Sequence, residues 1–195
     1  MLSADEIRRR YDEIRGAAPG VTVVAATKYV SFADMAVLAE AGIEFVGENR
    51  AQDLERKHAE YGDAFVWHFI GHLQSNKVKV VNGICELVHS LSSESAARRL
   101  EVPALVEVNL SGEGSKAGVP PEELEPLLGS NVRGLMTMPP LAQDAEASRP
   151  YFRRLREIAE AYSLPELSMG TTQDWSVAVE EGATLIRVGS VLFQG

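Results

Sequence analysis

Short apolar runs rich in β-branched residues recur along the chain, and segments with helical spacing separate them. Most of these runs are continuously apolar without strict alternation, which is typical of strands buried on both faces of a parallel sheet. The predicted strands are Val21–Thr27, Phe45–Gly47, Trp67–Leu73, Ile84–Leu91, Ala104–Leu110, Val132–Met138, Glu166–Met169 and Leu185–Phe193.

The intervening segments carry helix start and stop signals. Ser3 with Glu6 and Ser31 with Asp34 have the spacing of capping boxes. Apolar residues recur at intervals of three and four from Tyr151 to Tyr162, as on an amphipathic helix. We expect helices at 3–14, 31–42, 49–62, 120–129, 151–162 and 172–182.

Strands that alternate with helices form βαβ units, which give either an open doubly wound sheet or a closed barrel. Eight strands favour closure. We therefore predict one domain, residues 1–195, folded as a parallel (β/α)8 TIM-type barrel. The chain stops two residues after the eighth predicted strand, so the N-terminal helix is expected to replace a helix after that strand.

Composition narrows the classes of function. The 195 residues carry a formal net charge of −9, which argues against a surface for nucleic acid or anionic lipid because both need an excess of Lys and Arg. The acidic N-terminus is unlike a signal peptide, and no apolar stretch is long enough to cross a bilayer. The lone cysteine, Cys85, in the predicted strand Ile84–Leu91, excludes an internal disulfide. A soluble, cytoplasmic monomer is expected.

Polar residues at the ends of the predicted strands are the candidates for chemistry, because barrel active sites form at the C-terminal rim. Lys28 follows Val21–Thr27, so its stem is expected to begin inside the barrel mouth. Partial burial there would favour the neutral amine, which is the form that attacks an aldehyde. The alternative is a lysine whose ammonium simply extends into solvent.

The last two predicted strands end in small residues. Ser168 and Gly170 lead into a helix start, and Gly189 and Ser190 follow the eighth strand. Free N–H groups at such positions bind phosphate, although turn glycines and capping hydroxyls explain the same pattern. Arg187 lies within an apolar run, so it must meet either a carboxylate or a ligand, and it points into the barrel if its neighbours face the helices.

Two histidines, His68 and His72, invite a metal hypothesis. Histidines at this spacing lie one above the other on a helix and could share a metal there, but this segment is predicted to be a strand. We expect them to donate hydrogen bonds near the rim, and we predict no metal site. No nucleophile elbow accompanies Ser111 or Ser115, so hydrolase chemistry is not supported.

Several motifs in order resemble the pyridoxal-phosphate homeostasis proteins, the YggS-like or PROSC-like family, which is similar to the barrel domain of alanine racemase without its second domain. The resemblance covers Val23 to Gly195. The motifs are Ala26-Thr27-Lys28, Gly47-Glu48-Asn49, His68-Phe69-Ile70-Gly71, Leu73-Gln74-Ser75-Asn76-Lys77, Val108-Asn109, Ser115-Lys116-Ala117-Gly118, Gly134-Leu135-Met136, Leu167-Ser168-Met169-Gly170 and Arg187-Val188-Gly189.

The resemblance implies that Lys28 holds pyridoxal 5′-phosphate as a Schiff base. It implies that Arg187 faces the pyridine nitrogen and that Asn49 and Met136 line the ring. The phosphate would be held by Ser168, Gly170, Gly189 and Ser190.

Three functions remain open at this stage. The first is a carrier that buffers the cofactor and delivers it to PLP-dependent apo-enzymes, without substantial turnover. The second is a racemase-like enzyme, which needs an acid/base on the opposite face of the ring; Tyr29 is the one tyrosine near the rim and is expected on the wrong strand face. The third is an aldolase that uses Lys28 directly on a sugar phosphate.

Overall fold

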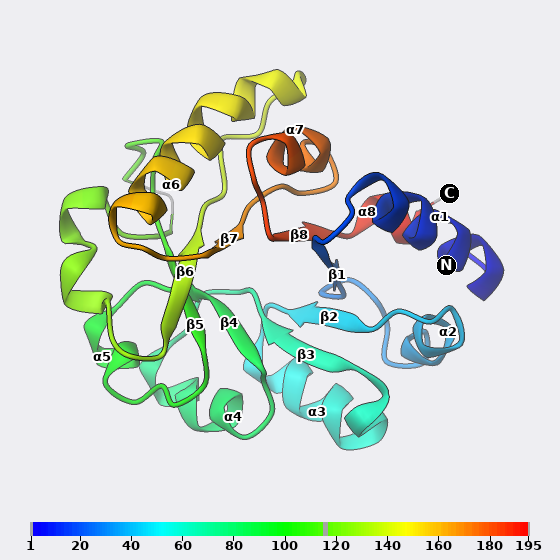
Figure 1. The fold of residues 1–195 in the computed structure, drawn as a ribbon. Coiled ribbons are helices and arrows are strands. Elements are labelled where there is room, and N and C mark those ends of the chain that lie inside the picture. The colour runs from blue at the N-terminus through cyan, green and yellow to red at the C-terminus, as the bar shows by residue number, and fades with distance from the viewer. Residues whose placement is uncertain (1, 115–116, 195) are drawn as a thin grey trace.

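The computed structural model describes residues 2–114 and 117–194, and over these residues it forms a closed barrel of parallel strands in sequence order (Figure 1). The predicted (β/α)8 barrel is confirmed. The strands are β1 Thr22–Ala26, β2 Phe45–Glu48, β3 Val66–Phe69, β4 Leu87–Leu91, β5 Ala104–Glu107, β6 Val132–Met136, β7 Glu166–Ser168 and β8 Leu185–Val188.

The helices surround the barrel, and α1 begins as predicted, with the Ser3 hydroxyl accepting a hydrogen bond from the Glu6 amide. Its buried face is Ile7, Tyr11 and Ile14. The helices are α1 Ala4–Ala17, α2 Met35–Glu40, α3 Ala51–Tyr61, α4 Val78–Asn82, α5 Glu94–Ala97, α6 Arg149–Ala161, α7 Trp175–Glu180 and α8 Ser190–Phe193, with single 3-10 turns at Gly62–Ala64, Ser75–Lys77, Pro121–Glu123, Glu125–Leu127 and Ala145–Ser148.

The core has two layers. The larger layer lies between strands and helices, and a smaller cluster comprises Val24, Leu87, Leu105, Met136 and Leu185. On β8, Leu185 belongs to the smaller cluster whereas Ile186 and Val188 belong to the outer layer. Because neighbouring side chains on a strand point to opposite faces, Arg187 shares the inner face with Leu185, as predicted.

The prediction for the end of the chain is wrong. The eighth strand stops at Val188, and Ser190–Phe193 form helix α8 beside α1 (Figure 1). The ladder with β1 ends at the pair Ala25 and Val188, so the following residues have no strand to extend. The apolar residues that suggested a strand instead pack against the helical layer, where Leu192 is fully buried.

Two further predictions need correction. The expected helix over 120–129 is replaced by two 3-10 turns, because Pro126 lacks an N–H and interrupts the helix. Cys85 is buried, as a packing residue should be, but it precedes β4 rather than lying within a strand. Most of the other predicted strands extend past the C-terminal end of the observed strand, whereas the predicted Phe45–Gly47 is one residue shorter than β2 and the predicted Ile84–Leu91 begins three residues before β4.

Gly170 illustrates how tightly the β7–α7 connection is packed. Its φ is +93°, and a Cβ added there would lie 2.6 Å from the Ala178 Cβ and 2.9 Å from the Trp175 Cα. We expect Gly170→Ala to lower the free energy of unfolding by about 3 kcal/mol, through overpacking and backbone strain. Urea denaturation would measure this, with Gly16→Ala, where a Cβ meets nothing within 4 Å, as the matched control. Equal stability of the two variants would contradict the packing argument.

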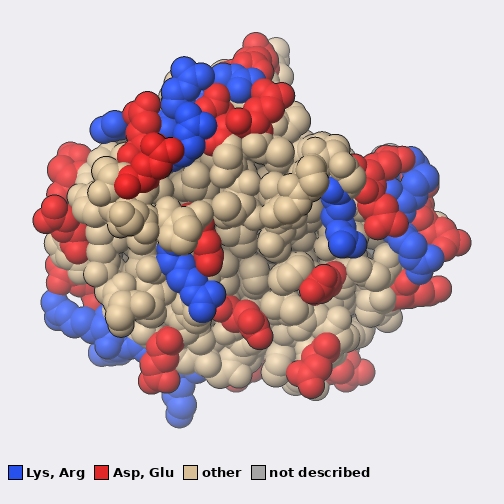
Figure 2. All heavy atoms as spheres, in the orientation of Figure 1, with Lys and Arg blue, Asp and Glu red and all other residues tan. Residues whose placement is uncertain are grey.

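Charged side chains of both signs lie side by side on the surface. On the face in Figure 2, Lys and Arg stand beside Asp and Glu along α6 and α1, where ion pairs such as Arg153 with Glu181 and Arg9 with Glu6 occur. In residues 2–114 and 117–194, no helix has the length and apolar character needed to cross a membrane. Over the same residues, no three His, Cys, Asp or Glu side chains cluster as metal ligands.

Candidate cofactor site

The rim of the barrel carries a cavity of about 490 Å³ that gathers five of the predicted site residues. These are Lys28 after β1, Asn49 after β2, Arg187 on β8, and Gly189 and Ser190 after β8. The remaining lining residues are Ala26, Tyr29, Val30, Asp34, Ile70, Met138, Leu141, Thr171, Thr172, Gln173, Phe193 and Gln194. The volume suits a small organic ligand.

Lys28 lines this cavity, but the expectation that it is partly buried is wrong. Its side chain is exposed, and its Nζ lies 4.8 Å from the centre of the exposed Tyr29 ring. The strand ends at Ala26, two residues before the lysine, so Lys28 stands on the first turn of the rim loop. Its amine is therefore accessible to a ligand that enters the cavity from solvent.

The backbone next to Lys28 is fixed by a buried ion pair. The Lys57 ammonium lies 2.6 Å from the Glu48 carboxylate and donates a 2.9 Å hydrogen bond to the Thr27 carbonyl. The Thr27 hydroxyl donates to the same carboxylate oxygen. Lys57 was not among the residues predicted from the sequence. The feature that could have identified it is its core-facing position on α3, one turn after the buried Leu54.

Asn49 has a polar atom without a partner. Its side-chain oxygen is buried, and no hydrogen bond to it is found in the described part of the chain. Because a buried acceptor without a donor is costly, such an atom at a cavity wall points to a donor supplied by a ligand. The helix predicted to start at Asn49 begins at Ala51 instead, with Arg50 at its N-cap.

Arg187 lies inside the barrel and is held by two partners. Its guanidinium donates to the Ser168 hydroxyl and, at 3.2 Å, to the Thr137 carbonyl. Burial lowers the pKa of Arg187 to about 10, while the nearby carboxylates of Glu107 and Asp174 act in the opposite direction. The guanidinium therefore remains charged at neutral pH and faces the base of the cavity.

The other three predicted residues lie apart from the cavity wall. Met136 is in the inner apolar cluster, and Ser168 is fully buried beside Arg187. Gly170 makes the tight turn into α7, and its carbonyl accepts a hydrogen bond from the Arg187 amide. Ser168 and Gly170 thus both hydrogen-bond to Arg187, a residue of the wall.

The β7–α7 and β8–α8 connections meet at the cavity. The Gly189 amide donates to the Thr172 hydroxyl at 3.1 Å, which ties the two connections together. Ser190 opens α8, and the first N–H groups of a helix have no acceptor within that helix. Gly189, Ser190, Thr171 and Thr172 thus form one small, polar wall of the cavity. Such a wall is suited to an anion.

A pair of buried histidines extends this polar network away from the cavity. His89 Nδ1 lies 2.7 Å from the Ser168 hydroxyl, and His89 Nε2 lies 2.9 Å from His68 Nδ1. His68 was predicted to lie near the rim, and His89 was not predicted. The feature that could have identified His89 is its position two residues after Leu87, which places both side chains on the same face of β4. His72, in contrast, is exposed.

These histidines make the stability of the fold sensitive to acid. Burial lowers the pKa of His68 to about 4, and burial together with His68 and Arg187 lowers the pKa of His89 well below its usual value. The unfolded chain therefore binds more protons than the folded chain between about pH 6.5 and pH 4. The part of the free energy of unfolding that depends on these two neutral histidines is therefore complete above about pH 6.5 and is lost as the pH falls through this window.

We expect His68 alone to account for about 3 kcal/mol of this loss. Urea denaturation at several pH values would measure the slope, which should become shallower in His68→Gln. The exposed His72→Gln variant is the matched control and should keep the parent slope. An unchanged slope in His68→Gln would contradict the assignment.

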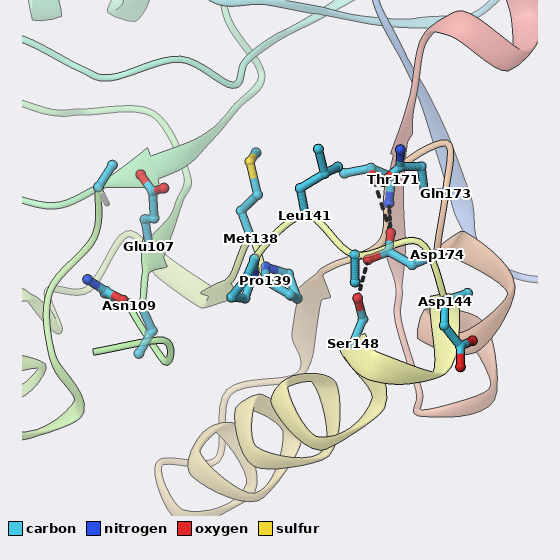
Figure 3. Close-up of a pocket in the computed structure, with 15 residues that line it drawn as sticks. Glu107, Asn109, Met138, Pro139, Leu141, Asp144, Ser148, Thr171, Gln173 and Asp174 are labelled. Carbon is cyan, nitrogen blue, oxygen red and sulfur yellow. Dashed lines mark hydrogen bonds between the residues drawn. The ribbon is translucent and has the colours of Figure 1, made fainter. Parts of the chain in front are cut away.

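A second cavity of about 350 Å³ adjoins the first and shares Met138, Leu141, Thr171 and Gln173 with it. Figure 3 shows Glu107 and Asn109 on its β5 side, and Asp174 with Ser148 on the opposite side. Asp174 is satisfied by hydrogen bonds from the Thr171 amide and hydroxyl and from the Ser148 hydroxyl. Ser115 and Lys116, in the loop after β5, lie outside the described residues.

Comparison with known proteins assigns the family. The family model for the alanine racemase N-terminal domain matches residues 2–195. A pyridoxal phosphate homeostasis protein of Aquifex aeolicus is 42% identical over 175 residues, covering 78% of this chain and 77% of the relative. A protein of the same name from Deinococcus radiodurans is 39% identical and covers 96% of this chain and 95% of the relative. The chain belongs to the pyridoxal phosphate homeostasis protein family.

Solved structures agree with this membership. PipY of Synechococcus elongatus, a protein solved both without PLP and with PLP bound, is 33% identical with a TM-score of 0.86, over 96% of this chain and 99% of PipY. Alanine racemase from Corynebacterium glutamicum shares 13% identity with a TM-score of 0.73, and this chain covers 61% of its length. That second likeness concerns the barrel fold alone.

Proposed function

We propose that this protein binds pyridoxal 5′-phosphate in the Lys28 cavity and acts in the intracellular homeostasis of that cofactor. The observation that carries the proposal is the convergence of an accessible primary amine, a buried arginine and a wall of small polar residues on one cavity. The names of the curated relatives and the PLP-bound structure of PipY support it.

Each cavity residue has a role in this proposal. Lys28 holds the cofactor through a Schiff base on Nζ. Gly189, Ser190 and Thr172 surround the phosphate, and Asn49 lines the ring. Three residues would act indirectly. Ser168 accepts a hydrogen bond from Arg187, Gly170 makes the β7–α7 turn, and Met136 fills the inner apolar cluster.

Arg187 favours holding the cofactor over catalysis with it. A charged guanidinium beside the ring nitrogen keeps that nitrogen unprotonated, and an unprotonated ring is a weaker electron sink. Ser168 and Thr137 fix the guanidinium in place. Racemisation also needs a second acid/base, and Tyr29 is a poor candidate because the residue is 87% exposed. The protein is therefore proposed to be a carrier or buffer that supplies PLP-dependent apo-enzymes.

A visible absorption spectrum of the purified protein incubated with pyridoxal phosphate tests binding. We expect a band that borohydride removes; a protein whose spectrum equals that of free cofactor would contradict the proposal. An assay of L-alanine conversion to D-alanine separates the two functions. Turnover above background by the loaded protein would favour a racemase-type enzyme.

A further inference from the structure

The second cavity contains a buried carboxylate that the chain leaves without a donor. Glu107 is 8% exposed, and no residue in 2–114 or 117–194 donates a hydrogen bond or forms an ion pair with its side chain. Burial raises the pKa of Glu107, opposed by the charges of Arg187 and His72. Because a carboxylate with little contact with water gains much from a charged donor, this group is suited to a cationic ligand.

The position of Glu107 is fixed by its backbone. The Val119 amide donates to the Glu107 carbonyl at 2.9 Å, and a Cβ on Gly118 would lie 3.1 Å from the Glu107 Cγ. Gly118 is therefore packed on the stem of this side chain, and the side chain lines the cavity. A preorganised group binds a ligand with a smaller loss of conformational entropy.

The rest of the cavity favours an aliphatic cation. Its lining includes Glu107, Asp144 and Asp174 but, among the described residues, no Lys, Arg or His. Asp174 already accepts three hydrogen bonds, which leaves Glu107 as the buried carboxylate that needs a donor. Between the two sides lies an apolar wall that includes Met138, Pro139 and Leu141 (Figure 3).

We propose that the Glu107 cavity is a binding site for a small aliphatic primary ammonium compound, with the ammonium on the Glu107 carboxylate and the carbon chain against Met138 and Leu141. The shared wall places this compound directly beside the Lys28 cavity. The proposal concerns binding alone and does not depend on a bound cofactor.

The test uses the full chain freed of pyridoxal phosphate, titrated with n-pentylammonium and followed by NMR. We expect saturable shifts of residues around Met138 and Leu141, and affinity at least about tenfold weaker for the neutral isostere n-pentanol. Equal affinity for the alcohol, or absence of saturable binding of the ammonium, would overturn the proposal.

Variants give a second comparison. Glu107→Gln should weaken n-pentylammonium binding by about tenfold or more, because it removes the charged acceptor while keeping the shape. Glu55→Gln, an equal change of charge on the exposed face of α3, should bind like the parent. Unchanged affinity in Glu107→Gln would overturn the assignment. If that variant fails to fold, the ammonium and alcohol comparison on the parent still decides the question.

Discussion

Replacing Lys28 with alanine is expected to abolish the visible absorption band of the protein incubated with pyridoxal phosphate. Arg187 and the polar wall remain in this variant, but the amine that attaches the aldehyde is gone, so gel filtration should remove the cofactor that the other residues hold without a covalent bond. Absorption spectra before and after gel filtration would measure the retained cofactor. We expect retention to fall to background.

The matched control is Lys79→Ala, which removes another exposed lysine, on α4 outside the cavity. It should keep the parent spectrum. Because Lys28 is exposed and outside the strands, its loss should leave the free energy of unfolding within about 0.5 kcal/mol of the parent. Full retention of the band in Lys28→Ala would mean that another amine holds the cofactor.

The second large effect concerns stability. Lys57→Met should lower the free energy of unfolding by about 3–5 kcal/mol, because it leaves Glu48 buried without its counterion. Glu48 already has one buried oxygen without a partner, so its surroundings offer no spare donor to replace the ammonium. Urea denaturation of the parent and the variant would measure the difference.

A double variant isolates the cause. Lys57→Met with Glu48→Gln removes both charges, so it should recover a substantial part of the lost stability. Lys79→Met on the exposed face of α4 should remain within about 0.5 kcal/mol of the parent. A loss of less than about 1 kcal/mol in Lys57→Met would contradict the role given to the pair.

The sequence predicts the barrel well because its fold depends on the periodicity of apolar residues, which is local information. Eight continuous apolar runs predict buried parallel strands, and Arg187 is correctly assigned to the interior from its position between Ile186 and Val188. The errors fall where tertiary contacts override pattern. The apolar segment after Val188 becomes a helix because the ladder between β8 and β1 ends at Val188, which leaves this segment without a neighbouring strand.

The site was predicted less completely, since its supporting residues interact across the barrel. Lys28, Asn49, Gly189 and Ser190 were found at the rim because they follow strand ends. The partners that hold the site come from other elements: Lys57 from α3 and His89 from β4. Glu107 was missed because a glutamate at the end of a strand is common. Its lack of a donor is visible only in the folded chain.

Peptide mapping decides whether Lys28 attaches the cofactor. The protein incubated with pyridoxal phosphate is reduced with borohydride, digested and mapped by mass spectrometry. We expect a single reduced pyridoxyl adduct, on the peptide that contains Lys28. An adduct on Lys57, Lys77 or Lys79 instead, or a protein without any adduct, would contradict it.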